Sequence, residues 1–365
     1  MKKKIAVIGL KGLPAYGGAA SVGENIIDQL KDKFDFTVYS VSSHTNCKTG
    51  NYRGYYQIVF KKIRNKKLNT LLYYIKATIH ILLFSRYDLI HLHHRDAGFI
   101  IPFLKIRYRV FLTTHSLGTV FDKWKRFQLY FTIQEKYFIK HADCISSVSK
   151  NETIYLKERY NIHSTYIPNG IKSNDIVRKN NFSNIEDEAY LFFGAGRIIR
   201  DKGLDILLRA MSSLKLTLKL VVAGDLNQIK TYKEEILILS EDLNLEYVGL
   251  IKNKDLLNNY IMGCQLFVYP SKKEAMSMML LEGASLKVPI ICSDIVENTD
   301  IFTDEEVLFF KANDYQDLAE KLQWALLNLD IMKEKSKLAY SKLQNEYLWS
   351  DIAIKYEDIY NSLSK

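Results

Sequence analysis

Short apolar runs, rich in β-branched and aromatic residues, alternate along this chain with segments of helical length. Strands that alternate with helices predict a parallel sheet with helices on both faces. In the first half the predicted strands are Ile5–Leu10, Phe36–Val41, Gln57–Ile63, Leu89–His94, Val110–His115, Cys144–Val148 and Tyr166–Pro168. In the second half they are Tyr190–Gly194, Leu218–Ala223, Glu246–Gly249, Leu266–Tyr269, Pro289–Cys292 and Val307–Phe310.

A polar stretch at 169–188 interrupts this pattern and is interpreted as a linker or a long loop. The 365 residues also exceed one ordinary core. We therefore predict two tandem Rossmann-like, doubly wound α/β domains, at 1–172 and 188–345, with a cleft between them. Segment 346–365 is predicted to be an amphipathic helix that can pack back on the first domain. Its apolar positions are Leu348, Ile352, Ile354, Tyr356 and Tyr360.

Charge is distributed unevenly between the two halves. The first 180 residues contain 30 Lys and Arg against 12 Asp and Glu, and the remainder contain 21 against 29. The basic half favours an anionic partner, which is a lipid surface, a nucleic acid or a phosphorylated substrate. Segment 61–67, KKIRNKK, directly precedes an apolar helix with tyrosines, as is typical of a membrane-surface element. A solvated basic loop beside a core helix would have the same pattern.

Several features indicate a cytoplasmic location. The apolar run before Lys11 is only six residues long, so we expect no secretory signal peptide. The longest apolar stretch, 68–88, is interrupted by Lys76 and His80 and falls short of a spanning helix. The four cysteines have no CxxC spacing, which favours free thiols in a reducing compartment. We expect a cytoplasmic protein whose basic half allows peripheral contact with the inner face of the membrane.

Glycines follow the first predicted strand, at Gly9, Gly12, Gly17 and Gly18, before a helix that we expect to begin near Ser21. Glycines at such a turn let backbone amides approach an anionic or sugar ligand at a helix N-terminus. The spacing is neither GxGxxG nor GxxxxGK[ST], which argues against nicotinamide enzymes and P-loop hydrolases. The alternative is that these glycines only build a long turn.

The second domain carries two cations in its first strand-to-helix loop. Arg197 and Lys202 precede a helix that is predicted to start near Gly203. A forked guanidinium and a point-charge ammonium beside a helix N-terminus can hold a diphosphate. The alternative is a solvated basic loop, but the place directly after a strand is where ligands of such sheets bind.

Two carboxylates follow a later strand of the same domain. Glu274 lies in the loop after Leu266–Tyr269, and Glu282 lies about two helical turns further along. This separation is too large for one shared carboxylate site, so we expect the two to serve different parts of one extended ligand. A surface position is the simplest alternative for an isolated glutamate, but apolar neighbours on both sides argue against it.

Taken together and in order, these motifs resemble those of the family 4 retaining glycosyltransferases of GT-B architecture. The resemblance rests on the glycine-rich turn and on ADCISSVS, YIPNGI, GRIIRDKGLD, VYPS and Glu274-x7-Glu282, and it spans nearly the whole chain. GLKGLPAYGG and THSLGTVFDKWKRF are most similar to segments of bacterial enzymes that build surface polysaccharides such as capsule and lipopolysaccharide. The family implies a sugar transfer, of hexosyltransferase type, from a nucleotide diphosphate sugar to a glycan or polyprenyl-diphosphate-linked acceptor. No cofactor is implied.

The resemblance implies a role for each matched residue of the second domain. Arg197 and Lys202 match the cations that bind the diphosphate and neutralise the leaving group. Glu282 matches the ligand of the ribose, and Glu274 matches the carboxylate that faces the donor sugar.

In the first domain, Gly17–Gly18 match the glycines that approach the donor, and His115 matches the active-site histidine. Two departures occur, at Met276–Ser277, where many members have Phe-Gly, and at Ala19–Ala20, where related enzymes have Phe-Glu. The second departure removes a carboxylate on the acceptor side.

A metal site is not expected. His91, His93 and His94 could be metal ligands, but they occupy alternating strand positions and have no acidic triad nearby. The chain also contains no Asp-x-Asp pair, which fits a metal-independent transferase.

Two other functions remain open from the sequence. A nucleotide-sugar 2-epimerase has the same paired domains, but we cannot place the extra acid and base carboxylates that it needs. A non-catalytic nucleic-acid binder would explain the pI near 9.1. However, a glutamate-lined cleft would repel nucleic acid.

Overall fold

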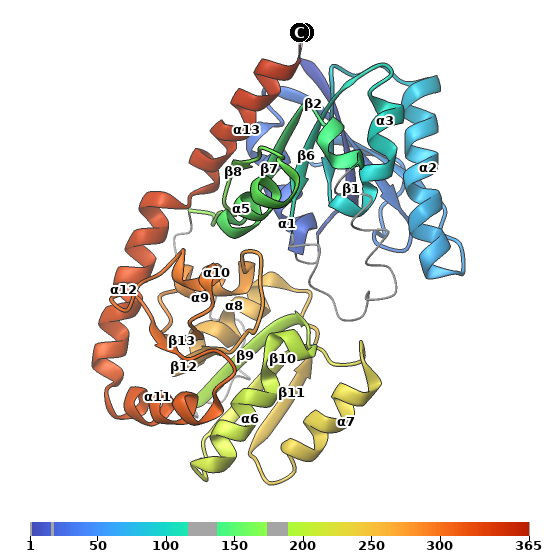
Figure 1. The fold of residues 1–365 in the computed structure, drawn as a ribbon. Helices are drawn as coiled ribbons and strands as arrows, with labels where there is room; N and C mark the ends of the chain where they lie inside the picture. Colours follow the sequence, from blue (N-terminus) through green and yellow to red (C-terminus); the bar gives the residue numbers. More distant parts are fainter. Residues whose placement is uncertain (1, 16–17, 116–136, 174–188, 365) are drawn as a thin grey trace. The chain divides into compact units, whose positions relative to one another are not determined.

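The structure is a computed structural model that describes residues 2–15, 18–115, 137–173 and 189–364. The chain forms two compact units. Unit 1 contains Met1–Gly170 and Trp349–Lys365, and unit 2 contains Ile171–Leu348. Each unit is built around its own sheet (Figure 1).

The sheet of unit 1 has the strand order β3-β4-β2-β1-β5-β6-β7-β8. Its neighbouring strands are parallel except for the β3–β4 pair. β1 is central, and its Val7 lies opposite Val38 on one side and His91 on the other. The strands are β1 (Lys3–Lys11), β2 (Phe34–Val41), β3 (Gly50–Tyr52), β4 (Tyr55–Phe60), β5 (Leu89–His93), β6 (Arg109–Thr114), β7 (Cys144–Ser147) and β8 (Thr165–Tyr166).

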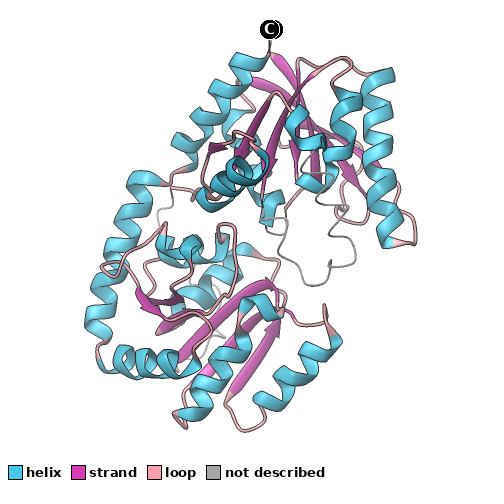
Figure 2. Cartoon of the chain, in the orientation of Figure 1, coloured by secondary structure: helices cyan, strands magenta, loops and turns pink. Residues whose placement is uncertain are grey.

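Helices cover both faces of this sheet (Figure 2). One core joins the sheet to α2, α3 and α5, and on the other side α1 contacts α13. Tyr356 and Tyr360 of α13 pack against Phe111 of β6, so the C-terminal helix belongs to unit 1. The helices are α1 (Gly18–Leu30), α2 (Lys66–Phe84), η1 (Arg95–Ile100), α3 (Ile101–Leu104), η4 (Ile139–His141), α5 (Lys150–Tyr160) and α13 (Trp349–Leu363).

Unit 2 has a sheet of order β11-β10-β9-β12-β13-β14, in which neighbouring strands are parallel. Phe192 of central β9 lies opposite Val221 and Phe267. The strands are β9 (Tyr190–Arg197), β10 (Lys219–Asp225), β11 (Leu245–Gly249), β12 (Leu266–Tyr269), β13 (Ile290–Ser293) and β14 (Leu308–Phe310). The helices are η5 (Arg200–Lys202), α6 (Leu204–Ser213), α7 (Lys230–Leu239), α8 (Lys254–Gly263), α9 (Met278–Ser285), α10 (Val296–Thr299), α11 (Tyr315–Leu327) and α12 (Leu329–Glu346).

The predicted doubly wound α/β class is confirmed, and the differences are local. β3 and β4 form a hairpin that the sequence did not indicate, and β4 ends three residues before the predicted Ile63. α1 begins at Gly18 rather than near Ser21. Ile354 is exposed, because helical geometry places it on the opposite side from Ile352 and Tyr356. Most of the predicted linker lies outside the described residues.

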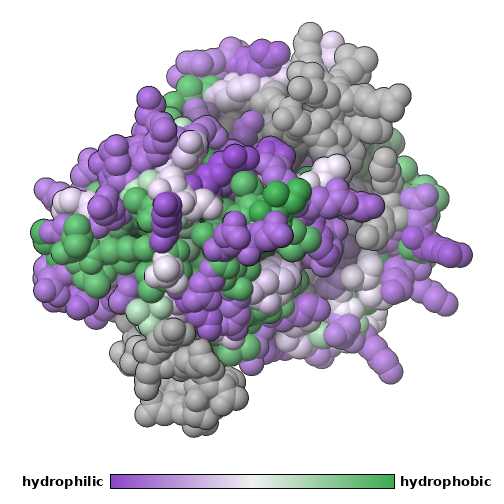
Figure 3. All heavy atoms as spheres, turned by 90° about the horizontal axis from the view of Figure 1, so that it is seen from below, coloured by the Kyte–Doolittle hydropathy of each residue, from purple (hydrophilic) through white to green (hydrophobic). Residues whose placement is uncertain are grey.

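Part of the apolar surface is exposed. Figure 3, which views the molecule from below, shows patches of hydrophobic residues among hydrophilic ones. In unit 2, α7 exposes Leu237 and Ile238, and in unit 1 α2 exposes a longer row that runs from Leu68 to Phe84.

Gly203 fixes the loop that carries the predicted cations. Its φ is +71°, and a Cβ there would lie 1.9 Å from the Pro270 carbonyl oxygen. This close approach brings the start of α6 against the end of β12. Only glycine fits, because a side chain would meet rigid backbone in a left-handed conformation.

We predict that Gly203→Ala lowers the free energy of unfolding of unit 2 by at least about 2 kcal/mol, through backbone strain and overpacking. Denaturant unfolding followed by circular dichroism measures this effect. Gly196→Ala is the matched control, since a Cβ there would meet nothing within 4 Å. Equal loss of stability in both variants would contradict the assigned role of Gly203.

Candidate active site

Glu274 lies at the centre of a hydrogen-bonded cluster at the carboxyl end of β12. Its Oε1 accepts from Tyr269 Oη, from Ser271 Oγ at 2.6 Å and from Lys202 Nζ at 2.5 Å. The side chain is only 9% exposed. No described group donates to Oε2, so one carboxylate oxygen is fixed by the protein and the other is available to a ligand.

Tyr269 keeps the proton that it donates. Burial, followed by the charge of Glu274, raises the pKa of Tyr269 well above its usual value. Ser277 Oγ donates to the same hydroxyl at 2.5 Å, and it also caps α9 by accepting from Leu280 N. Ser277 belongs to the Met276–Ser277 departure from the family pattern, and here it donates to the tyrosine that holds Glu274.

A second buried cluster braces the loop that carries Lys202. Asp205, in the first turn of α6, accepts from Lys272 Nζ at 2.8 Å and from Tyr232 Oη at 2.8 Å. Lys272 N also donates to the Asp201 carbonyl at 2.8 Å. Together with the Gly203–Pro270 contact, these bonds hold the β9–α6 and β12–α9 loops in one arrangement.

Glu282 and Arg197 are placed differently. The Glu282 carboxylate on α9 pairs with Lys254 of α8 and not with the Glu274 cluster. Arg197 ends β9 with an exposed side chain. The structure therefore joins Lys202 directly to Glu274, leaves Glu282 with its own partner, and keeps the Arg197 guanidinium accessible.

In unit 1, histidines meet where β5 and β6 end. His115 directly follows β6, and its Nε2 lies 2.9 Å from His93 Nδ1 with the two rings stacked. His91 is held by Thr113 Oγ1 and Tyr360 Oη, each at 2.8 Å. These bonds occupy one ring nitrogen of His115 and leave Nδ1 as its other hydrogen-bonding atom.

The glycine-rich turn lies beside these histidines. Gly9 has φ +108°, and a Cβ there would lie 1.9 Å from the His93 carbonyl oxygen, so glycine is required for β1 to pass this close to β5. Gly18 begins α1 with φ +60° and has open space around it. Gly17 lies outside the described residues. Glu24 of α1 accepts from Ala15 N at 2.9 Å and so fixes the turn.

Sequence reasoning named Glu274, Lys202 and His115 as candidates, but it did not name the residues that hold Glu274 or those that hold the neighbouring Glu282 and the glycine-rich turn. Tyr269 and Ser271 belong to the VYPS motif, whose place directly after a strand was the available signal. Lys254 and Glu24 carried no such signal, because their partners are brought near only by the fold.

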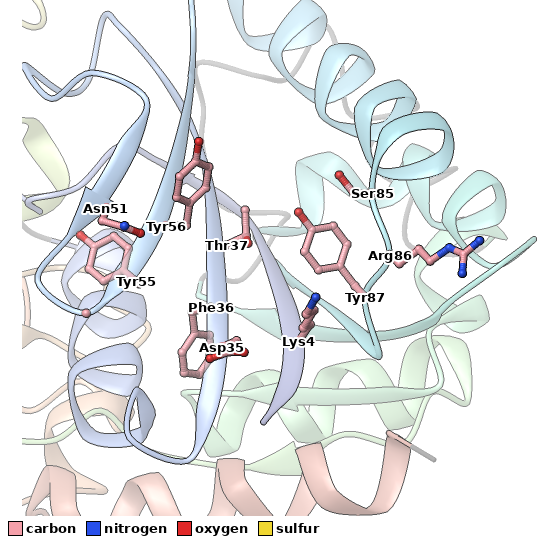
Figure 4. A pocket seen from close by; sticks show the side chains of 11 residues that line it. Lys4, Asp35, Phe36, Thr37, Asn51, Tyr55, Tyr56, Ser85, Arg86 and Tyr87 are labelled. Carbon is pink, nitrogen blue, oxygen red and sulfur yellow. The ribbon is translucent and has the colours of Figure 1, made fainter. Parts of the chain in front are cut away.

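A pocket at the other edge of the unit 1 sheet takes no part in this site. It encloses about 370 Å³ and is lined by residues near the amino ends of β1 and β2, among them Lys4 and Asp35 (Figure 4). Ligands of parallel sheets bind at the carboxyl ends of the strands. We therefore assign this pocket no role in the proposed chemistry.

The histidine cluster predicts how stability depends on pH. Burial is the main cause that lowers the pKa of His91, His93 and His115 well below the usual value, and neighbouring histidines lower it further. The folded state keeps these rings neutral, whereas in the unfolded chain they titrate near pH 6.5. Their stabilisation is therefore complete above about pH 6.5 and is lost as the pH falls below it.

We predict that wild-type thermal stability falls between about pH 7.5 and 5.5, and that His93→Gln depends less on pH over this range. Each neutral ring contributes at most about 1.4 kcal/mol per pH unit. Scanning calorimetry across the range measures both proteins. Parallel curves for the two would show that the His93 ring does not titrate on unfolding.

Two sequence-family models match the chain. Residues 16–175 match the glycosyltransferase family 4 model, and residues 175–342 match the model of glycosyl transferases group 1. O-antigen chain mannosyltransferase C of Escherichia coli is 25% identical, over 76% of this chain and 76% of its own length.

Solved structures are similar over almost the full length. Sucrose-phosphate synthase from Thermosynechococcus elongatus gives a TM-score of 0.85 at 21% identity, with 99% of each chain covered. HepE of Anabaena, solved in complex with UDP-glucose, gives 0.77 at 15% identity, covering 99% of this chain and 100% of its own. These similarities confirm the predicted GT-B architecture. The chain therefore belongs to the glycosyltransferases, and it joins a glycosyltransferase family 4 domain to a group 1 glycosyl transferase domain.

Proposed function

We propose that this glycosyltransferase moves a sugar, with retention of anomeric configuration, from a nucleotide diphosphate sugar to a bacterial surface polysaccharide or lipid-linked glycan. The observation that carries the proposal is the Lys202–Glu274 pair at the carboxyl ends of β9 and β12. It sets a cation beside a carboxylate that keeps one oxygen available. This combination suits a donor with an anionic diphosphate and a neutral, hydroxyl-bearing sugar.

The leaving group explains the need for cations. As the bond from the sugar to the diphosphate breaks, negative charge grows on the phosphate oxygens and positive charge grows at the anomeric carbon. Lys202 and Arg197 would stabilise the first, and Glu274 would bind a sugar hydroxyl through Oε2. Lys202 contacts both Glu274 and the proposed diphosphate, so it would couple sugar binding to departure of the leaving group. The proposal includes no metal and no other cofactor.

Retention follows if the acceptor hydroxyl attacks from the side that the diphosphate leaves. The departing phosphate oxygen then takes the acceptor proton, so no separate base of the chain is required. Water must be excluded while the anomeric carbon carries positive charge beside the departing diphosphate, because water would otherwise take the place of the acceptor. We propose that His115 also takes part in donor binding, with its Nδ1 in contact with a sugar hydroxyl.

Glu282 is assigned to the nucleoside. Its carboxylate, held by Lys254, can accept from both ribose hydroxyls, because Glu282 lies in the second turn of α9, away from Glu274 in the loop before that helix. UDP-glucose is bound in the Anabaena structure, which supports a nucleotide sugar as donor here. The E. coli relative is named for building an O-antigen chain, which supports a surface polysaccharide as acceptor.

We predict that Glu274→Gln and Lys202→Ala each lower kcat at least about 100-fold, the scale of one lost contact in the transition state. Transfer of radiolabelled sugar to an acceptor glycan measures the effect. Glu334→Gln is the control, because it removes the carboxylate of an exposed Lys337 pair on α12. Activity that stays near the wild-type value in either site variant would exclude that residue from the reaction. The anomeric configuration of the product distinguishes transfer with retention from inversion, and epimerisation would leave the acceptor unmodified.

The donor is identified by thermal shift with a panel of nucleotide sugars, because a ligand that binds only the folded state raises the melting temperature. We predict that Glu282→Ala weakens the binding of the stabilising nucleotide sugar about tenfold, since it removes hydrogen bonds to a charged acceptor. Titration calorimetry provides the dissociation constants. Unchanged affinity would place the ribose elsewhere.

A further inference from the structure

α2 of unit 1 is apolar on two faces. Its inward positions include Tyr73, Tyr74 and Ala77, which are buried in the hydrophobic core of the unit. Tyr73 Oη donates to the Tyr39 carbonyl at 2.8 Å and accepts from Gly9 N at 2.9 Å. The second apolar face points outward, where a surface helix usually has charged and polar residues.

The outward face is a continuous apolar stripe. At about 100° per residue, its members project within an arc of about 120°. Exposure reaches 68% at Leu83, whereas Leu72 and Leu82 are half-buried at the border of the stripe. The members are Leu68, Leu71, Leu72, Ile75, Ile79, Leu82 and Leu83.

The apolar surface continues from the end of α2 onto α3 and the turn that follows α3. Arg107 Nη1 donates to the Leu82 carbonyl at 2.9 Å, and Tyr108 Oη donates to the Ser85 carbonyl at 2.8 Å. These bonds join the end of α2 to the turn after α3, and Phe103 of α3 and Ile106 of this turn are both exposed. α2 and α3 lie side by side at the outer edge of unit 1 (Figure 1).

A basic rim surrounds this apolar surface. Residues 61–87 contain seven Lys and Arg and no Asp or Glu. The rim has exposed cations before the helix, beside the stripe and after the helix. Figure 4 shows the cation after the helix, Arg86, whose guanidinium points away from the pocket near Lys4 and Asp35. These cations are Lys61, Lys62, Arg64, Lys76 and Arg86.

We propose that this surface docks unit 1 on an anionic lipid bilayer, with α2 lying in the plane of the interface. An apolar stripe with a basic rim buries its leucines at the level of the acyl chains and keeps its cations among anionic headgroups. None of the helices that the structure describes is long and apolar enough to cross a membrane. The inward face of this 19-residue helix is already packed in the core of unit 1, so only its outward face is available to the lipid.

Charge decides between a bilayer and a second copy of the chain. Two copies that met through this stripe would bring two basic rims together, which like-charge repulsion disfavours. An anionic bilayer instead complements the rim. The inference goes beyond the proposed function, and it does not depend on which nucleotide sugar is the donor.

Co-sedimentation of the full chain with vesicles tests the proposal. We expect binding to vesicles of phosphatidylcholine with phosphatidylglycerol, weaker binding at high salt, and little binding to phosphatidylcholine alone. Ile75→Glu/Ile79→Glu should lower partitioning at least about tenfold, because it places two carboxylates in the middle of the stripe. Lys62→Glu/Arg64→Glu should remove most of the dependence on phosphatidylglycerol.

Leu237→Glu/Ile238→Glu is the matched control, since it makes the same change on the exposed face of α7 in unit 2. It should bind vesicles as the wild type does. Circular dichroism establishes that all variants are folded. The proposal is overturned if the wild type does not bind anionic vesicles. It is equally overturned if Ile75→Glu/Ile79→Glu binds them as well as Leu237→Glu/Ile238→Glu does. It is also overturned if sedimentation without lipid shows a dimer that the Ile75→Glu/Ile79→Glu change dissociates.

Discussion

Parallel strands need crossover connections, and these connections place the carboxyl ends of all the strands at one edge of the sheet. Both units obey this constraint, and it explains where their chemically active side chains lie. In unit 2 the loops after β9 and β12 bring Lys202 to Glu274, although 72 positions separate them in the sequence. In unit 1 the ends of β5 and β6 bring His93 to His115. In each pair, the order of the parallel strands places the two backbone positions next to each other, whichever side chains they carry.

Side chains then decide what these edges can do. A carboxylate that is nearly buried is unfavourable unless it is paired and hydrogen-bonded. Glu274 meets this requirement through one oxygen, where a lysine and two hydroxyls converge. The unused oxygen is held in a fixed direction before any ligand arrives, as a preorganised site requires. Asp205 and Lys272 secure the neighbouring loop in the same way.

Sequence periodicity was sufficient for the fold class, because buried parallel strands are continuous apolar runs. Motif order also pointed to Lys202, Glu274 and His115 as candidate site residues, and the structure brings the first two into contact. What the sequence could not provide was pairing across long separations. The Lys254–Glu282 pair and the brace on Asp205 arise only once helices are packed, and local patterns carry no record of them. The β3–β4 hairpin was missed because β3 has only three residues, Gly-Asn-Tyr, which give no strand pattern.

The outward stripe of α2 shows a second limit of sequence analysis, which is that the sequence does not show which face of a helix is buried. Its composition was visible in the sequence, yet an apolar helix beside a basic segment is compatible with a core position. Only the structure shows that the tyrosines point inward and the leucines outward. Periodicity identifies two faces of a helix, but burial decides which of them needs a partner.

The central claim is that Lys202 and Glu274, which the strand order of unit 2 brings together, bind the nucleotide sugar. Hydrogen–deuterium exchange with the nucleotide sugar that stabilises the protein most tests it directly. The account predicts slower exchange of backbone amides around 197–205 and 269–282. Unchanged exchange in these two segments, with protection elsewhere in the chain, would contradict the account.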